Sequence, residues 1–287
     1  MTKKEIASPL RFPGSKSRVY NKMCKYFNIP HSEYREPFVG GGSIFLKKTL
    51  AQNNWINDKD ELIYSFFIIL RDNPEGLCKR IRDIGLPTVE LWQKLRKEVP
   101  KTTLDKAFSL LFFNRTNYSG IYKANPIGGM GQKSRYTIDC RWNADLLCER
   151  IMDCSRKLKD VKITCYDYEE LLLSPGEDVL IFLDPPYYEK GSQLYPVSMT
   201  HEEHVKLACL LRETSHKFLL TIDDCPMTRE IYCRGDFYIN SESWSYTINS
   251  SKIDKEGREM FISNFYPVDQ SIFDFDVSFS IHDNVSL

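Results

Sequence analysis

Short apolar runs alternate with amphipathic segments through most of the chain. Several of the runs end in glycine or aspartate, as VLIFLD does at 179–184, and segments with helical spacing of apolar residues follow them. Alternating β and α units predict a mostly parallel sheet with helices on both faces. We therefore expect an α/β fold.

The individual elements can be assigned from the same pattern. Strands are expected at 34–39, 54–57, 161–167, 178–184 and 217–223, and near 236–240 and 259–266. Helices are expected at 17–27, 43–50, 142–157, 167–173 and 201–213, and 61–113 is mostly helical in pattern. A loop rich in Gly, Asn, Tyr and basic residues follows at 114–139. Near the end of the chain, Phe273 to Ile281 alternates apolar and polar residues, which predicts an amphipathic strand.

The composition is that of a folded protein. Of the 287 residues, 42% are hydrophobic and 13% aromatic, which excludes a disordered chain. No apolar run approaches the roughly 18 residues of a membrane span, and the N-terminus lacks the apolar core of a signal peptide. Nine cysteines without a CxxC pair predict buried, reduced thiols, no zinc site and a cytoplasmic protein. His201 and His204 are expected in the exposed first turn of a helix capped by Thr200.

Charge is segregated along the chain although 39 basic and 39 acidic residues cancel. Residues 1–50 hold 10 basic and 3 acidic side chains, a balance of +7, and residues 101–165 hold 12 and 6, a balance of +6. Residues 166–265 hold 9 basic and 18 acidic side chains, a balance of −9. The first two segments predict a basic surface for a polyanion, unless folding scatters their charges.

A glycine-rich turn follows the first expected strand. EPFVGGGS, at 36–43, places glycines where a strand passes into a helix, so that the backbone can approach a ligand closely. Asp58 ends the next strand, 18 positions after Gly40, where α/β nucleotide sites carry a ribose-binding carboxylate. This spacing favours a nucleoside site, with a simple turn as the alternative. The absence of GxGxxG argues against a pyrophosphate-binding dehydrogenase.

A second motif, Asp184-Pro185-Pro186-Tyr187, follows a strongly apolar strand. The Asp184 carboxylate and the Pro185 carbonyl offer two hydrogen-bond acceptors side by side, and Tyr187 adds an aromatic ring. This arrangement suits the two hydrogens of an exocyclic amine on a base that stacks on the ring. The alternative is an ordinary Pro-Pro turn after a strand.

Taken together, RFPGSK at 11–16, PFVGGGS at 37–43 and DPPY at 184–187 resemble the D12-class, Dam-like N6-adenine DNA methyltransferases. Their order resembles the alpha arrangement of amino-methyltransferases. Further landmarks of the family recur at 57–60, 112–129, 166–172 and 248–266, so the resemblance covers about residues 8–267. Pro13 departs from the small residue common in Dam-like members.

The resemblance implies a Rossmann-like sheet that uses S-adenosylmethionine, with an inserted, mainly helical target-recognition domain. We expect the catalytic domain at 1–60 and 151–267, the insertion at 61–150, and a C-terminal extension with a strand at 268–287. The implied activity is methyl transfer to N6 of a flipped-out adenine in a specific short double-stranded DNA sequence.

The family's functional residues carry over by motif. The resemblance assigns the catalytic role to Asp184, Pro185, Pro186 and Tyr187. It assigns cofactor contacts to Phe12, Lys16, Phe38, Gly40, Gly42, Asp58, Asp167, Tyr168 and Asp184. The recognition loop interleaves basic and aromatic residues suited to phosphate contact, stacking and base readout. The DNA contacts expected from it are Arg115, Tyr118, Ser119, Tyr122, Lys123 and Arg135. Ser119 and Lys123 replace the Asn and Arg of GATC-specific members, which leaves the target sequence open.

Other readings of the same motifs remain. An N4-cytosine methyltransferase would hold its amine with the same acceptor pair. An RNA or protein-glutamine methyltransferase would use a related tetrapeptide, usually led by Asn. A catalytically silent DNA-binding relative would carry a broken motif. Besides double-stranded DNA, the resemblance implies a companion restriction endonuclease, no membrane, a monomer or weak dimer, and a bacterial or phage-infected cytoplasm.

Overall fold

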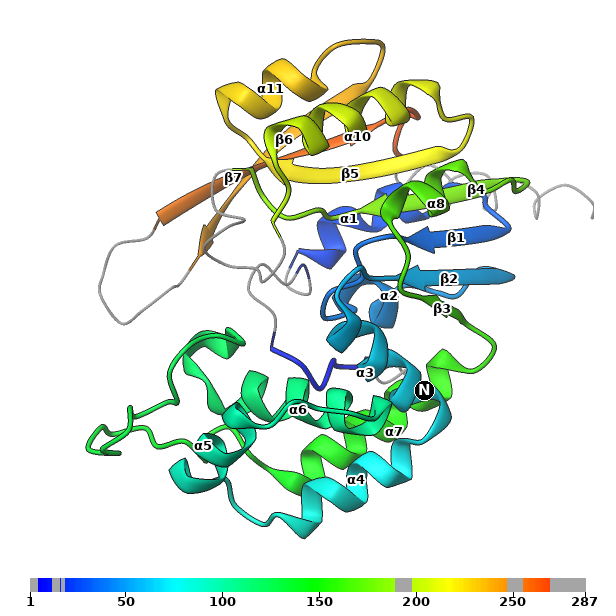
Figure 1. Cartoon of the computed structure of the whole chain (residues 1–287). Helices are drawn as coiled ribbons and strands as arrows, with labels where there is room; N and C mark the ends of the chain where they lie inside the picture. The colour runs from blue at the N-terminus through cyan, green and yellow to red at the C-terminus, as the bar shows by residue number, and fades with distance from the viewer. Residues whose placement is uncertain (1–4, 12–15, 17–18, 189–197, 247–254, 269–287) are drawn as a thin grey trace, which may run out of the picture.

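The computed structural model describes residues 5–11, 16, 19–188, 198–246 and 255–268. Their strands form a seven-stranded sheet in the order β3-β2-β1-β4-β5-β7-β6 (Figure 1). The strands are β1 (Glu33–Glu36), β2 (Asn53–Asn57), β3 (Lys162–Thr164), β4 (Val179–Leu183), β5 (Lys217–Asp223), β6 (Tyr238–Tyr246) and β7 (Lys255–Ser263). The first five strands in this order are parallel, and β7 runs antiparallel to β5 and β6. The α/β expectation is therefore confirmed.

Helices cover both faces of this sheet. They are α1 (Tyr20–Phe27), α2 (Ser43–Lys47), α3 (Glu61–Asp72), α4 (Pro74–Asp83), α5 (Val89–Lys97), α6 (Thr103–Thr116), α7 (Ala144–Leu158), α8 (Tyr168–Leu173), α10 (His201–Glu213) and α11 (Pro226–Tyr232). In β4, Leu180 and Phe182 pack with the α1 side, whereas Ile181 and Leu183 pack with α8, α10 and α11. The buried strand thus supplies two apolar cores, as a doubly covered parallel sheet requires.

Helices α4, α5, α6 and α7 gather to one side of the sheet (Figure 1). Helix α6 is the centre of this group, since every residue from Ala107 to Thr116 is buried. It begins at a capping box formed by Thr102 and Asp105. The apolar residues of these helices are continuous with those of the α1 side of the sheet. The division of the chain at 61 and 150 stays a prediction.

The segment before α1 joins the two parts of the molecule. The Arg11 amide donates to Asn114 Oδ1 at 2.7 Å, and Asn114 Nδ2 donates back to the Arg11 carbonyl at 2.7 Å. Gly120 must be glycine at this point, because a Cβ would lie 2.8 Å from the Arg11 oxygen and its φ is +75°. The N-terminal segment is therefore fixed against the end of α6, between the helices and the sheet (Figure 1).

Several element boundaries differ from the sequence prediction. Strand β1 ends at Glu36 instead of 39, because Pro37 has no amide hydrogen for the ladder. Helix α6 continues three residues past 113 into the expected loop, since its last turn is fully buried. Helix α11 was not predicted, and it begins with Pro226 in its first turn. The strand expected at Phe273 to Ile281 lies outside the described residues.

The histidine pair is only partly as expected. Thr200 does cap α10 through a capping box with Glu203. His204, however, is buried rather than exposed, and its Nδ1 lies 2.8 Å from the Tyr232 hydroxyl. His204 is buried because it shares one face of α10 with Leu207, Ala208 and Leu211, which are also buried.

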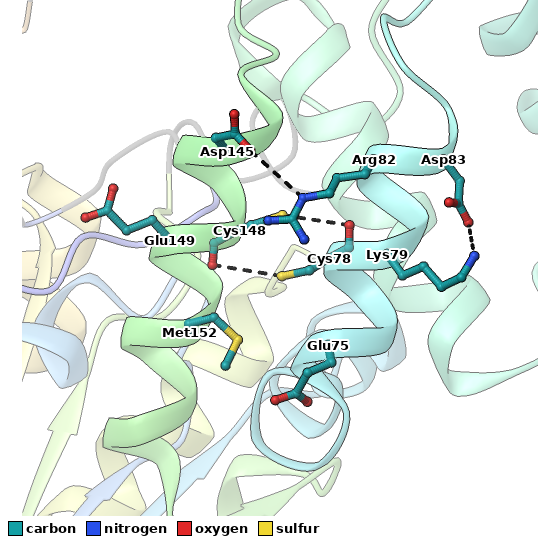
Figure 2. A pocket seen from close by; sticks show the side chains of 9 residues that line it. All are labelled: Glu75, Cys78, Lys79, Arg82, Asp83, Asp145, Cys148, Glu149 and Met152. Atoms are coloured by element: carbon teal, nitrogen blue, oxygen red, sulfur yellow. Dashed lines mark hydrogen bonds and ion pairs between the residues drawn. The ribbon is translucent and has the colours of Figure 1, made fainter.

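The cysteines are free thiols, but the expectation that they are buried is wrong for Cys140 and Cys209, which are exposed. Figure 2 shows a surface pocket of about 500 Å³ between α4 and α7, where Cys78 and Cys148 face each other. Each sulfur lies against the other residue's carbonyl, at 3.9 Å and 3.7 Å. Burial raises the pKa of the Cys78 thiol to about 12, which favours an unreactive packing role. No helix in the described ranges is long and apolar enough to cross a bilayer.

Candidate functional site

The sequence motifs meet where the strand order reverses. Strands β2 and β1 lie on one side of this point and β4 and β5 on the other, so the carboxyl ends of β1 and β4 flank it. Open α/β sheets bind their ligands at such a switch point. Asp58 follows β2, the glycine turn follows β1, and Asp184 follows β4. The topology therefore brings both motifs to one edge of the sheet.

Asp184 is held by one of its two carboxylate oxygens. Its Oδ1 accepts from Lys16 Nζ at 2.9 Å and from Thr221 Oγ1 at 2.9 Å. The side chain of Asp184 is 25% exposed, and within the described part of the chain no hydrogen bond reaches Oδ2. Burial raises the pKa of Asp184, and Lys16 opposes that rise. The carboxylate thus presents a fixed, open oxygen at the carboxyl edge of the sheet.

Lys16 lies within this site although its neighbours in sequence fall outside the described residues. Its ammonium contacts Asp184, the Tyr187 hydroxyl at 2.7 Å and Glu259 Oε2 at 3.3 Å. It is 2% exposed. Tyr187 is also buried, and its hydroxyl donates to Glu259 Oε1. Phe12, the other residue expected from the first motif, lies outside the described ranges.

Three residues of this site were not predicted from the sequence. Thr221 of β5 supports Asp184, Glu259 of β7 contacts Lys16, and Glu36 at the end of β1 is buried. Thr221 is a polar residue within an otherwise apolar strand, and that exception is the signal by which it could have been found. Glu36 and Glu259 lie in strands that carry other charged residues, so no local signal marks them.

The glycine turn and Asp58 form one unit. The Gly40 amide donates to Asp58 Oδ2 at 2.9 Å, and the Asp60 amide donates to Oδ1 at 3.0 Å. Gly40 and Gly42 have φ values of +49° and +69°. A Cβ on Gly42 would also lie 2.7 Å from the Phe67 ring, so packing requires this glycine as well. Burial raises the pKa of Asp58 to about 7.

A third set of residues lies on the side of β3 and α8. The rings of Phe38 and Tyr168 lie 5.4 Å apart, between the glycine turn and the start of α8. Asp167 Oδ2 accepts from Lys59 at 2.7 Å, whereas its Oδ1 is buried without a hydrogen-bond partner. A buried acceptor of this kind needs a donor from a ligand or water. The exocyclic amine of an adenine ring fits that requirement, so the residues present are compatible with S-adenosylmethionine.

The expected DNA contacts divide into exposed and buried residues. Tyr118, Ser119, Lys123 and Arg135 are exposed, and Ser119 has a left-handed φ of +55°. Tyr122 instead packs against Phe113, with ring centroids 5.2 Å apart. Arg115 is only 7% exposed, and its guanidinium donates to the Pro9 carbonyl. As the structure places it, Arg115 anchors the N-terminal segment and does not reach a phosphate, because α6 carries it into the interior.

Glu36 gives the fold a distinct pH dependence. Burial raises the pKa of Glu36 to about 8, while its Oε2 accepts from the Tyr34 hydroxyl at 2.7 Å. At pH values between 4.5, the ordinary pKa of a glutamate, and about 8, Glu36 keeps its proton in the folded state and has lost it in the unfolded state. Stability therefore falls as pH rises through that window. Asp58, raised to about 7, adds to the same slope, whereas Lys48, lowered to about 8, titrates above the window.

Glu36→Gln is expected to flatten this decline, because glutamine keeps an acceptor for Tyr34 and carries no proton to lose. Thermal melts at pH values from about 5 to 8.5 should show that the melting temperature of the variant rises relative to that of the wild type as pH rises. Parallel curves would mean that Glu36 is charged in the fold at neutral pH.

Known proteins to which this chain is similar are methyltransferases. A family model described as D12 class N6 adenine-specific DNA methyltransferase matches residues 12–248. A type II methyltransferase of Lactococcus lactis subsp. cremoris is 23% identical, over 83% of this chain and 91% of that protein. A type II methyltransferase of Paramecium bursaria Chlorella virus NC1A is 22% identical, over 86% and 94%. The DNA adenine methylase of Escherichia coli K12 is 24% identical, over 71% and 76%.

Proposed function

Because the chain belongs to the D12 class of N6 adenine-specific DNA methyltransferases, we propose that Asp184 and Pro185 hold the N6 amine of an adenine flipped out of the duplex. The family establishes methyl transfer to adenine N6 in DNA, with S-adenosylmethionine as methyl donor. We further propose which residues of this chain carry out that transfer and which of them determine the DNA sequence around the target adenine.

The open oxygen of Asp184 is the observation that carries the proposal. Lys16 and Thr221 both donate to Oδ1, which fixes the plane of the carboxylate and leaves Oδ2 for a new donor. Pro185 follows directly, and a proline carbonyl accepts although the residue cannot donate. These two acceptors match the two hydrogens of one exocyclic amine. A free thiol or hydroxyl nucleophile is not needed for this chemistry.

Hydrogen bonds to both amine hydrogens make N6 a better nucleophile. The lone pair of an aromatic amine is delocalised into the ring, and the two acceptors favour a geometry nearer tetrahedral, in which the lone pair is available. They also stabilise the positive charge that develops on N6 as the new bond forms. S-adenosylmethionine, when bound, supplies an activated sulfonium methyl group. The protein contributes alignment of the amine with that group, at a separation of roughly 3–3.5 Å.

We assign the cofactor contacts to residues that follow β1, β2 and β3. Asp58, fixed by the Gly40 and Asp60 amides, is placed to accept from ribose hydroxyls. The unpartnered Asp167 Oδ1 supports a contact with the cofactor adenine, and Phe38 with Tyr168 supplies apolar surface beside it. Tyr187 is proposed to bound the pocket of the flipped base with its ring, while its hydroxyl stays with Lys16 and Glu259.

The loop after α6 is proposed to read the DNA. Tyr118, Ser119 and Lys123 are exposed on it, and Arg135 follows on the same connection. A cluster of arginines surrounds Arg115, which lies on the last turn of α6 directly before this loop. Burial, followed by repulsion from the neighbouring arginines, lowers the pKa of Arg115 to about 10; those neighbours are Arg150, Arg11 and Arg141. Because Arg11 belongs to the first basic segment and the others to the second, this cluster supports a joint basic surface for phosphates.

The proposal extends to sequence specificity and to a companion enzyme. Two of the relatives above are named type II methyltransferases, and such a role would pair this protein with a restriction endonuclease of the same target. Sequencing the methylated bases of DNA co-expressed with the protein tests the whole proposal. N6-methyladenine within one short motif is the expected result. Methylated cytosine, or N6-methyladenine without a motif, would contradict it.

Lys123→Ala is expected to weaken DNA binding, because Lys123 is an exposed cation on the recognition loop. A phosphate contact predicts uniform weakening, whereas a base contact predicts a loss of about 1–3 kcal/mol of discrimination at one position. Affinity measurements on the target duplex and on single-base variants separate the two. Lys217→Ala is the matched control, since Lys217 begins β5 at the opposite edge of the sheet. Equal affinities of both variants and the wild type for DNA would show that the loop is not part of the DNA interface.

A further inference from the structure

Glu259 is a buried carboxylate that neither the sequence motifs nor the proposed catalytic set accounts for. It lies on β7, opposite Asp223 of β5 in the antiparallel ladder, and is 1% exposed. A carboxylate is almost never fully buried unless it is paired. The partners of Glu259 therefore indicate why the protein keeps it.

Two partners of Glu259 belong to the site. Its Oε2 lies 3.3 Å from Lys16 Nζ, and its Oε1 accepts from the Tyr187 hydroxyl. Lys16 also contacts the Tyr187 hydroxyl at 2.7 Å. Three buried groups from the N-terminal segment, the DPPY motif and β7 thus form one closed hydrogen-bonded triangle.

The ammonium of Lys16 is consequently shared between two carboxylates. It lies 2.9 Å from Asp184 Oδ1 on one side and 3.3 Å from Glu259 on the other. If Glu259 were neutral, Asp184 would be the only charged partner of Lys16 among these groups. An ammonium drawn fully onto Asp184 would withdraw electron density from the oxygen that must accept the adenine amine.

Resting on the proposed placement of the amine against Asp184, we propose that Glu259 is a positioning residue for methyl transfer. It holds Lys16 at the rear of Asp184 and fixes the Tyr187 ring through its hydroxyl. Asp184 Oδ2 therefore remains open and strongly accepting toward the base. Glu259 acts through Lys16 and Tyr187 and does not itself touch the substrate.

The pKa of Asp184 gives a measurable test of this role of Glu259. Burial raises its pKa, Lys16 lowers it, and the negative charge of Glu259 raises it. The other groups that face it are Thr221, which donates to it, Tyr187, which shares Lys16, and Glu36, whose charge couples to that of Asp184. Removing the charge of Glu259 therefore lowers the pKa of Asp184. Activity requires the Asp184 carboxylate, so the acidic limb of the pH–rate profile moves to lower pH.

Glu259→Gln tests the proposal in the full-length protein. The expected result is a fall in kcat of about tenfold to a hundredfold, as for a small misplacement of reacting groups. KM values for DNA and S-adenosylmethionine should change little, and the acidic limb should shift to lower pH. Glu242→Gln is the matched control, because Glu242 is the ladder partner of Glu259 on β6 and pairs with the surface residue Lys22 at 3.0 Å. That variant should keep the wild-type kcat and profile.

A double-mutant cycle with Lys16→Met covers the case in which the single variant folds poorly, because the double variant removes both buried charges together. If Glu259 acts through Lys16, adding Glu259→Gln to Lys16→Met has little further effect on kcat. An undiminished effect in that background, an unmoved acidic limb, or a wild-type kcat in Glu259→Gln overturns the proposal. Failure of the wild type to methylate adenine would instead overturn the proposed function, so the two failures are distinguishable.

Discussion

Asp184→Ala is expected to lower the rate of methyl transfer by about 10²–10³, the usual cost of removing one preorganised group that stabilises transition-state charge. The loss arises because N6 keeps only the Pro185 carbonyl as acceptor, and Lys16 loses one of the two carboxylates that share its ammonium. Single-turnover transfer of a labelled methyl group to target DNA measures this step directly. Binding of DNA should persist, because the exposed basic residues lie on the recognition loop.

Asp178→Asn is the control for this variant. Asp178 precedes β4 at the opposite end of the strand, pairs with Lys217, and has a left-handed φ of +50° that asparagine tolerates. The Asp178→Asn variant should transfer methyl groups at the wild-type rate. A near-wild-type rate for Asp184→Ala would mean that the amine is held elsewhere.

Salt should weaken DNA binding steeply if the two basic segments form one surface. With about five phosphates neutralised, log affinity should fall against log salt with a slope of about −4.5, so a fourfold rise in salt lowers affinity roughly 500-fold. Fluorescence anisotropy on a target duplex gives the slope. Arg141→Ala should make it shallower by about 0.9, because Arg141 is an exposed member of the arginine cluster.

Arg234→Ala is the matched control for the salt series, since Arg234 lies in the acidic segment and pairs with Glu230. It should leave the slope unchanged. A slope near zero for the wild type would show that the basic residues are dispersed over the surface rather than gathered toward DNA.

The recognition loop shows where sequence reasoning stopped. The pattern NRTNYSGIYK marks basic and aromatic residues that suit a DNA interface, but composition does not say which of them face outward. Arg115 faces inward because α6 extends to Thr116, and its buried last turn carries Arg115 to the Pro9 carbonyl. Tyr122 lies beyond the helix and is half-buried, with its ring against Phe113. Lys123 lies beyond that turn and is exposed. The position at which the helix ends therefore decides that Arg115 anchors the N-terminal segment, whereas Lys123 is exposed for contact with DNA.

By itself, the sequence determined where the main strands lie and placed the glycine turn and the DPPY tetrapeptide after them, because periodicity, glycine and proline act over a few residues. It thereby determined the α/β class and the motifs that follow β1, β2 and β4. The tertiary structure alone decided which side chains surround Asp184. Lys16 and Glu259 are 243 positions apart and meet only because β7 pairs with β5, which in turn lies beside β4. Thr221 reaches Asp184 through the same strand order. Such neighbours depend on long-range pairing of strands, and no local pattern of residues encodes that pairing.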